Sequence, residues 1–148
     1  MANFEPFPVA VIGAGPIGLA AAAHLIQRGV RVRAYEAGAS VGAHIRDWGH
    51  VRLFSPWGHN IDEAAKAILL RHGWQKPCSD SFPTGRDLVE SYLQPLAGTP
   101  EVAAVIEVVA RVTAITRYGV DKVVSPGRQT KPFELLVTGA DGRVRRGP

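Results

Sequence analysis

The sequence has one cysteine, Cys78, among its 148 residues. A disulfide between two of these residues is therefore impossible, and a zinc site built from several thiolates is excluded. Three histidines, His44, His50 and His59, lie near one another, but their spacings match no helical pattern of metal ligands. We therefore predict no metal site.

Long apolar runs are also missing. No stretch reaches the roughly 18 residues of a membrane-spanning helix, and the first residues lack the basic start of a signal peptide. We expect a cytoplasmic protein with no membrane partner. The formal net charge is +4, but basic residues cluster only at Arg143, Arg145 and Arg146. Without a basic helix or interleaved aromatic and basic residues, nucleic acid is not a predicted partner.

The composition is that of an ordinary globular protein. Hydrophobic residues make up 46% and charged residues 20%, which argues against disorder and coiled-coil structure. The length suits one domain. No G-x-S-x-G segment surrounds Ser55, and no base is identifiable as a partner for Cys78, so we name no catalytic residue.

The first 36 residues have the pattern of a βαβ unit. The apolar, β-branched run at 8–12 predicts a buried strand. A glycine turn follows, then an Ala- and Leu-rich helix over 19–28 that Gly29 ends. The alternating segment 30–36 predicts a second strand, and a βαβ unit over 8–36 has the expected size.

The rest of the chain divides into a segment of loops and helices, 37–98, and a β-meander, 106–146. The elements expected in the first part are a short strand at Val51–Phe54, a helix at 62–72 and a helix at 84–97 that begins with a T-x-x-D capping box. The meander is expected to contain strands at 106–117, 131–138 and 142–146. We predict an α/β fold over 1–148: a Rossmann-type parallel sheet with flanking helices and an attached antiparallel meander.

The glycine turn carries the strongest functional signal. Gly13, Gly15 and Gly18 form a G-x-G-x-x-G motif between a strand and a helix, the context in which this motif binds a dinucleotide. Gly13 permits the tight turn, Gly15 lets a pyrophosphate approach the helix N-terminus, and Gly18 allows close packing. Glu36 ends the second strand, where its carboxylate can accept hydrogen bonds from ribose hydroxyls and repel a 2′-phosphate. The alternative is a tight turn that binds no ligand.

The segment from Val9 to Leu25, together with Gly29-Val-Arg-Val, Glu36 and Gly42, resembles the FAD-binding part of flavoproteins with two dinucleotide-binding domains. The later strand Ala110–Ile115 and the meander match as well. The resemblance implies FAD as the cofactor and a main-chain contact to adenine near Val112. The cofactor-binding residues it implies are Gly13, Gly15, Pro16, Ile17, Gly18, Glu36, Ala37, Gly42 and Val112.

Within this resemblance, the lack of a cysteine pair favours flavin-dependent monooxygenases and related oxidoreductases over disulfide reductases. Such enzymes also have a second glycine motif for NAD(P)H and a late Gly-Asp segment, and neither is present here. We therefore expect a partial domain that is not catalytically competent by itself and tends to self-associate, with an unknown small-molecule substrate for the complete enzyme. Residues 46–57 either contact the flavin or form a loop packed on the core. A second hypothesis is a module that binds FAD, NAD or ADP without catalysis.

Overall fold

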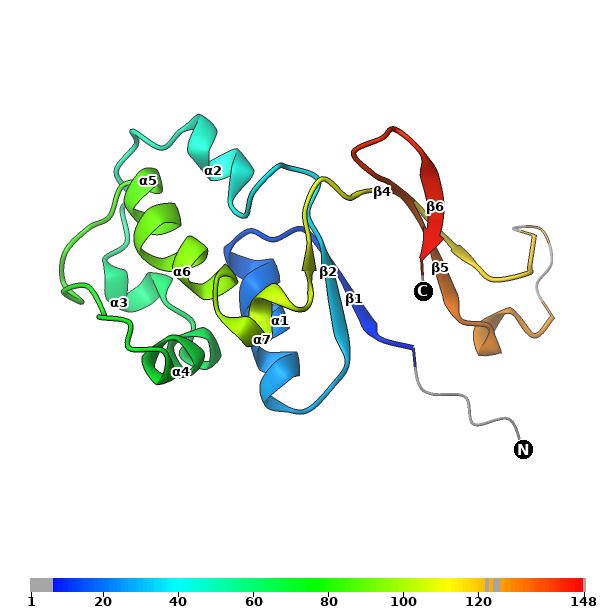
Figure 1. Cartoon of the computed structure of the whole chain (residues 1–148), viewed down its shortest axis with the longest axis horizontal. Coiled ribbons are helices and arrows are strands. Elements are labelled where there is room, and N and C mark those ends of the chain that lie inside the picture. Colours follow the sequence, from blue (N-terminus) through cyan, green and yellow to red (C-terminus); the bar gives the residue numbers. More distant parts are fainter. Residues whose placement is uncertain (1–6, 122, 124–125, 148) are drawn as a thin grey trace.

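The computed structural model describes residues 7–121, 123 and 126–147. Its elements form three layers, with a parallel sheet between a group of helices and an antiparallel sheet (Figure 1). The parallel sheet has the order β1-β2-β3, and the antiparallel sheet has the order β4-β5-β6. This architecture confirms the predicted fold class.

The βαβ unit forms where it was predicted, but its first strand, expected to be buried, is largely exposed because it lies at the edge of the sheet among the described residues. Strand β1 (Val9–Ile12), helix α1 (Pro16–Gln27) and strand β2 (Val32–Tyr35) follow one another, and β1 pairs in parallel with β2. The side chains that α1 buries are small or compact: Leu19, Ala22 and Ala23. They let the helix lie close to the sheet. Gly29 follows the helix with φ +67°, a left-handed conformation that suits glycine.

The helical layer comes mainly from the middle of the chain. It contains α2 (Ala43–Asp47), α3 (Trp57–Asn60), α4 (Glu63–Arg71), α5 (Gly85–Leu88), the π-helical turn η1 (Val89–Leu93), α6 (Gln94–Ala97) and α7 (Pro100–Ala103). The Asp62 side chain caps α4 by accepting the N–H of Ala65, and Thr84 and Asp87 form the predicted capping box at α5. Both longer predicted helices are therefore confirmed, although a π turn interrupts the second. The short helices α2, α3 and α7 were not predicted.

The predicted strand at Val51–Phe54 is wrong. Arg52 alone forms an isolated β-bridge, with Thr84. Backbone bonds from Leu53 N–H to the Pro83 carbonyl and from Gly85 N–H to the Val51 carbonyl flank this bridge. Thr84 is the N-cap of α5, so the partner segment turns into a helix there and the pairing does not continue as a strand. Ser55 and Pro56 then lead into α3.

The predicted strand over 106–117 is two strands in different sheets. Strand β3 (Ile106–Glu107) pairs in parallel with β2, whereas β4 (Arg111–Arg117) pairs antiparallel with β5 (Phe133–Thr138), which pairs with β6 (Val144–Gly147). The chain turns between the two sheets at Val109, whose φ of 52° is incompatible with a continuous strand. The 3-10 turn η2 (Arg128–Thr130) precedes β5.

The two sheets are joined by apolar and charged contacts. Tyr35 of β2 packs with Ala110, Leu135 and Val137 in a small buried cluster. Arg145 of β6 donates a hydrogen bond to the Glu107 carboxylate of β3 and lies 5.9 Å from the centre of the Tyr35 ring. No helix within the described ranges is long and apolar enough to cross a membrane.

Candidate functional site

The predicted glycine turn joins the carboxyl end of β1 to the N-terminus of α1. Gly13 has φ +97°, a conformation that favours glycine, and its N–H donates to the Tyr35 carbonyl at 2.7 Å. This bond continues the β1–β2 pairing by one residue and holds the turn at the edge of the sheet. The turn therefore begins from a fixed backbone position.

Gly15 and Gly18 serve different needs. A Cβ built on Gly18 would lie 1.9 Å from the Gly13 carbonyl oxygen, so only glycine fits there. A Cβ built on Gly15 would meet nothing within 4 Å. The protein itself leaves the space beside Gly15 open, as the approach of a pyrophosphate requires.

The backbone at this turn offers hydrogen-bond donors to an anion. Pro16 occupies the first position of α1 and has no N–H, while Leu19 N–H donates to the Gly15 carbonyl. In the part of the chain that the structure describes, the N–H groups of Gly15, Ile17 and Gly18 have no hydrogen-bond partner. These donors, at the positive end of a 12-residue helix, favour a phosphate.

Glu36 lies directly beside the turn. Only 8% of the residue is exposed, and its Oε2 accepts the N–H of Ala14 at 2.7 Å. Its Oε1 accepts the N–H of Gly38 at 2.7 Å. The sequence predicted a carboxylate near the turn but not these two backbone bonds. A carboxylate has about four acceptor sites, so Glu36 retains capacity for ribose hydroxyls.

The loop after β2 closes back on the glycine turn. Ala37 and Gly38 follow Glu36, and a Cβ on Gly38 would lie 2.4 Å from the Cβ of Ala43. Gly42 has φ +66°, and its N–H donates to the Ala14 carbonyl at 3.1 Å. The structure therefore brings Gly42 against the turn, and its part in binding a cofactor stays a prediction.

The segment that enters β4 lies on the other side of this loop. Ala110 N–H donates to the Glu36 carbonyl at 2.8 Å, and Val109 N–H donates to the Gly38 carbonyl at 2.9 Å. Val112 follows in β4, partly buried against the Tyr35 cluster and next to a β-bulge at Thr113. The start of β4 thus adjoins the Glu36 loop. Val109 was not singled out from the sequence because no local signal marks a β-branched residue for positive φ.

Residues 46–57 include both packed and exposed side chains. Trp57 is 5% exposed and belongs to the main core, and a Cβ on Gly85 would lie 2.7 Å from the Trp48 ring. Phe54, in contrast, is 98% exposed. Packing on the core accounts for Trp57, whereas Trp48 and Phe54 are exposed, and contact of this segment with a flavin stays a prediction.

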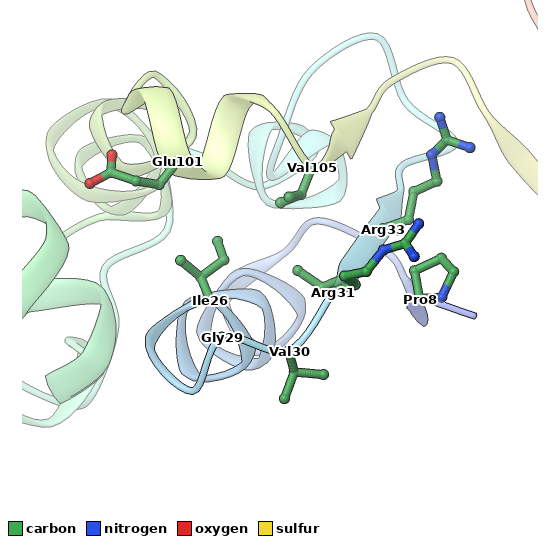
Figure 2. Close-up of a pocket in the computed structure, with 9 residues that line it drawn as sticks. Pro8, Ile26, Gly29, Val30, Arg31, Arg33, Glu101 and Val105 are labelled. Carbon is green, nitrogen blue, oxygen red and sulfur yellow. The ribbon is translucent and has the colours of Figure 1, made fainter. Parts of the chain in front are cut away.

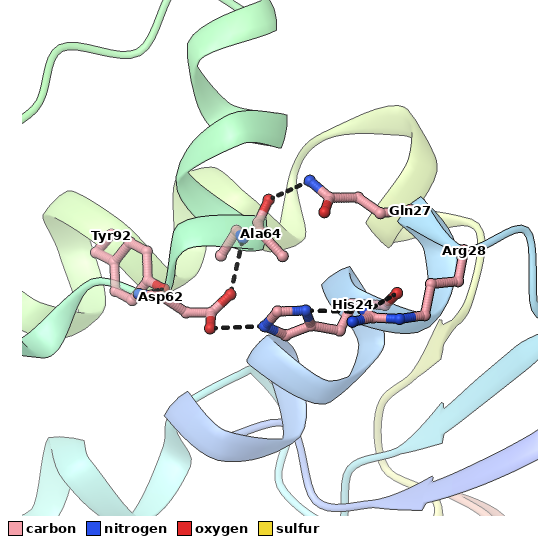
Figure 3. A network of polar contacts seen from close by, with 7 residues as sticks. His24, Gln27, Arg28, Asp62, Ala64 and Tyr92 are labelled. Carbon is pink, nitrogen blue, oxygen red and sulfur yellow. Dashed lines mark hydrogen bonds and ion pairs between the residues drawn. The ribbon is translucent and has the colours of Figure 1, made fainter.

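A polar network joins α1 to α4 (Figure 3). His24 Nε2 lies 3.0 Å from Asp62 Oδ2, and Arg28 lies 3.0 Å from His24 Nδ1. Because arginine only donates, Nδ1 accepts and Nε2 carries the proton given to Asp62. Asp62 N–H donates to the Tyr92 hydroxyl oxygen at 3.1 Å, and burial raises the pKa of Tyr92. This network stabilises the packing of α1 against α4.

A hollow of about 640 Å³ lies at the opposite end of the sheet from the glycine turn (Figure 2). Arg31 and Arg33 border it on one side, and Glu101 borders it on the other. Glu101 is engaged by Arg71 and His72. None of the predicted site residues lines this hollow. Within the described ranges, no three His, Cys, Asp or Glu side chains are grouped so as to hold a metal ion.

Comparisons with known proteins agree with this geometry. Residues 11–75, which include the glycine turn, Glu36 and Gly42, match the family model of an NAD(P)-binding Rossmann-like domain. No curated protein matches the chain.

Solved structures share the fold over 95% of this chain. The monooxygenase OTEMO in complex with FAD and NADP has a TM-score of 0.62 at 23% identity. A steroid monooxygenase bound to NADP gives the same values. The bacillithiol disulfide reductase Bdr from Bacillus cereus has a TM-score of 0.69 at 19% identity. The chain spans 24% of each monooxygenase and 36% of the reductase.

Proposed function

We propose that this chain is the FAD-binding part of a flavin-dependent, monooxygenase-like oxidoreductase that uses NAD(P)H and a small-molecule substrate in its complete form. The main support is the open space beside Gly15. It lies at a turn where the N–H groups of Gly15, Ile17 and Gly18 are free among the described residues and where the Glu36 carboxylate accepts the Ala14 N–H. The similar structures crystallised with FAD and NADP support this proposal.

Each part of the site would hold one part of the cofactor. The N–H groups of Gly15, Ile17 and Gly18 would bind the pyrophosphate, and Glu36 would accept hydrogen bonds from the adenosine ribose. Ala37, Gly42 and the main chain near Val112 would border the adenosine half. When bound, the isoalloxazine ring supplies the redox chemistry, and the protein supplies position and electrostatics.

FAD is favoured over NADP because of Glu36. Its carboxylate would repel the 2′-phosphate of NADP, and it already holds the turn in place through Ala14. We expect FAD and ADP to bind more tightly than NADP. Titration calorimetry with the three ligands measures this order, and NADP as the tightest ligand would contradict it.

The site assignment is tested with Gly15→Val. The new side chain enters space that no protein atom occupies, so the fold should survive while the pyrophosphate is blocked. We expect ADP and FAD binding to be lost, with the circular dichroism spectrum unchanged. Glu36→Ala should weaken ADP binding by about 1–3 kcal/mol. Unchanged affinity in Gly15→Val would overturn the assignment.

A dinucleotide-binding module without catalysis is the second candidate. The glycine turn favours it as well, because the open space beside Gly15 and the N–H groups of Gly15, Ile17 and Gly18, free within the described ranges, account for nucleotide binding without a catalytic side chain. Visible absorbance distinguishes the candidates. A bound flavin that NADPH bleaches supports the oxidoreductase, whereas nucleotide binding without bleaching supports the module.

We also propose a cytoplasmic location and self-association. The exposed thiol of Cys78 is compatible with a reducing compartment. Among the described residues, no strand pairs with the outer edge of β1, and this supports self-association because unpaired strand edges invite pairing with another chain.

A further inference from the structure

The helix that runs from α5 through α6 contains a wide turn at η1. The N–H of Gln94 donates to the carbonyl of Val89, five residues earlier, as in a π-helix. Pro95 comes next in the chain. Because proline has no N–H and its ring crowds the carbonyl four residues back, the carbonyl of Ser91 loses its helical partner. The indole N–H of Trp74 donates to this carbonyl instead, at 2.8 Å. Pro95 and Trp74 together favour the wide turn.

The wide turn packs against the loop of the candidate site. Val89 and Leu93, at its two ends, are fully buried. A Cβ built on Gly42 would lie 3.0 Å from Cγ2 of Val89 and 3.2 Å from Cδ1 of Leu93. These two side chains therefore form the wall that fixes how far the Gly42 backbone can move.

Gly42 is hydrogen-bonded to the glycine turn, so its position affects the turn. Its N–H donates to the Ala14 carbonyl at 3.1 Å, and the Ala14 N–H donates to Glu36 at 2.7 Å. Ala14 is fully buried and immediately precedes Gly15. A shift of Gly42 would therefore change the orientation of the backbone N–H groups of Gly15, Ile17 and Gly18 at the turn.

We propose that Val89 and Leu93 are positioning residues for dinucleotide binding, acting through Gly42 and Ala14 without touching the ligand. This inference rests on the proposed function of the glycine turn. It assigns a role in binding to a helix turn that lies more than 70 residues after the glycine motif in the sequence. Packed side chains and hydrogen bonds of this kind alter affinity at a distance when their arrangement changes.

The test compares Leu93→Ala with Leu69→Ala in the full chain. Leu69 of α4 is a matched control because it is equally buried in the same core but lies outside the Gly42 wall. Denaturant unfolding gives the stability of each variant, and calorimetry gives its ADP affinity. The amide proton shift of Ala14 reports the hydrogen bond to Glu36.

We expect both substitutions to lower stability, whereas only Leu93→Ala weakens ADP binding, by about tenfold, and moves the Ala14 amide resonance. Val89→Ala removes less volume and should produce a smaller effect of the same kind, which keeps the test usable if Leu93→Ala does not fold. Leu93→Met conserves volume and should restore affinity.

Equal loss of affinity in Leu69→Ala and Leu93→Ala would overturn the positioning role, since stability alone would explain it. Unchanged affinity in both Leu93→Ala and Val89→Ala would also overturn it. If the unmodified chain does not bind ADP, the proposed function itself fails and this inference fails with it. The ADP titration of the unmodified chain therefore separates the two cases.

Discussion

At the scale of single residues, the glycines of the motif are required for different reasons. Gly18 is needed by the fold, because its Cα faces the Gly13 carbonyl with no room for a methyl group. Gly15 is not needed by the fold, because it is extended at φ −82° and faces open space. A glycine at a position where the fold accepts a side chain agrees with the proposed approach of a pyrophosphate at Gly15.

The two glycines should therefore differ when each is replaced by alanine. Gly18→Ala places a methyl group against a backbone carbonyl and should lower the free energy of unfolding by about 3 kcal/mol or more. Gly15→Ala should change it by less than about 0.5 kcal/mol while weakening ADP binding. Denaturant unfolding and calorimetry measure both effects. Similar stability losses in the two variants would contradict the distinction.

At the scale of secondary structure, a capping box fixes the residue at which α5 begins. Thr84 and Asp87 cap α5 reciprocally: the Asp87 N–H donates to the Thr84 hydroxyl at 3.1 Å, and the Thr84 N–H donates to Asp87 at 2.8 Å. The backbone N–H of Thr84, and then its hydroxyl, lowers the pKa of Asp87. The helix that starts at this capping box continues into η1, whose Val89 and Leu93 side chains pack against Gly42.

Asp87→Ala should lower the free energy of unfolding by about 1 kcal/mol at neutral pH, the usual value of a cap. Because the folded pKa lies below the unfolded one, the contribution of Asp87 is complete above about pH 4 and is lost as the pH falls through the folded pKa. The difference from the unmodified chain should therefore shrink in acid.

Urea unfolding at several pH values from neutral to acidic measures the difference in free energy of unfolding between Asp87→Ala and the unmodified chain. Asp80→Ala is the matched control, since Asp80 is exposed and has no hydrogen bond within the described ranges. We expect Asp80→Ala to change the free energy of unfolding by less than about 0.5 kcal/mol. A constant deficit for Asp87→Ala down to strongly acidic pH would contradict the role of the charged carboxylate.

At the scale of the whole molecule, β1 is an edge strand among the described residues although its sequence is that of a buried one. Val9 and Gly13 direct their N–H groups to β2, so those of Ala10 and Ile12 point to the free side. A groove of about 510 Å³ runs beside this edge, with Phe7, Ile115, Phe133 and Leu135 in its wall. Of the described residues that border it, Arg117 alone is charged.

We expect a second copy of this chain to cover this edge, since two uncharged edges meet without burying charge. Ile12 is 53% exposed on β1. Ile12→Lys should abolish association because a lysine charge blunts an edge strand. Leu70→Lys, at a 50% exposed position on α4, is the control and should leave association intact. Sedimentation velocity over a range of concentrations measures this, and a monomer throughout would contradict the expectation.

Much of the architecture follows from local sequence. The βαβ unit, the helix caps and the pairing of β5 with β6 across a tight turn depend on periodicity and turn chemistry, which act between near neighbours. The glycine motif and Glu36 were identified from the same local signals. The Rossmann-type fold and the place of its candidate site were therefore determined by the sequence alone.

Other features depended on contacts between distant segments. The division of 106–117 into two strands follows from competition between β2 and β5 for partners, with Val109 held at positive φ. The loss of the strand at 51–54 follows from Thr84 starting a helix. The bond between Glu36 and Ala14 and the wall against Gly42 join residues far apart in sequence. Only the tertiary structure decided these, because no local pattern specifies which distant backbone a side chain will meet.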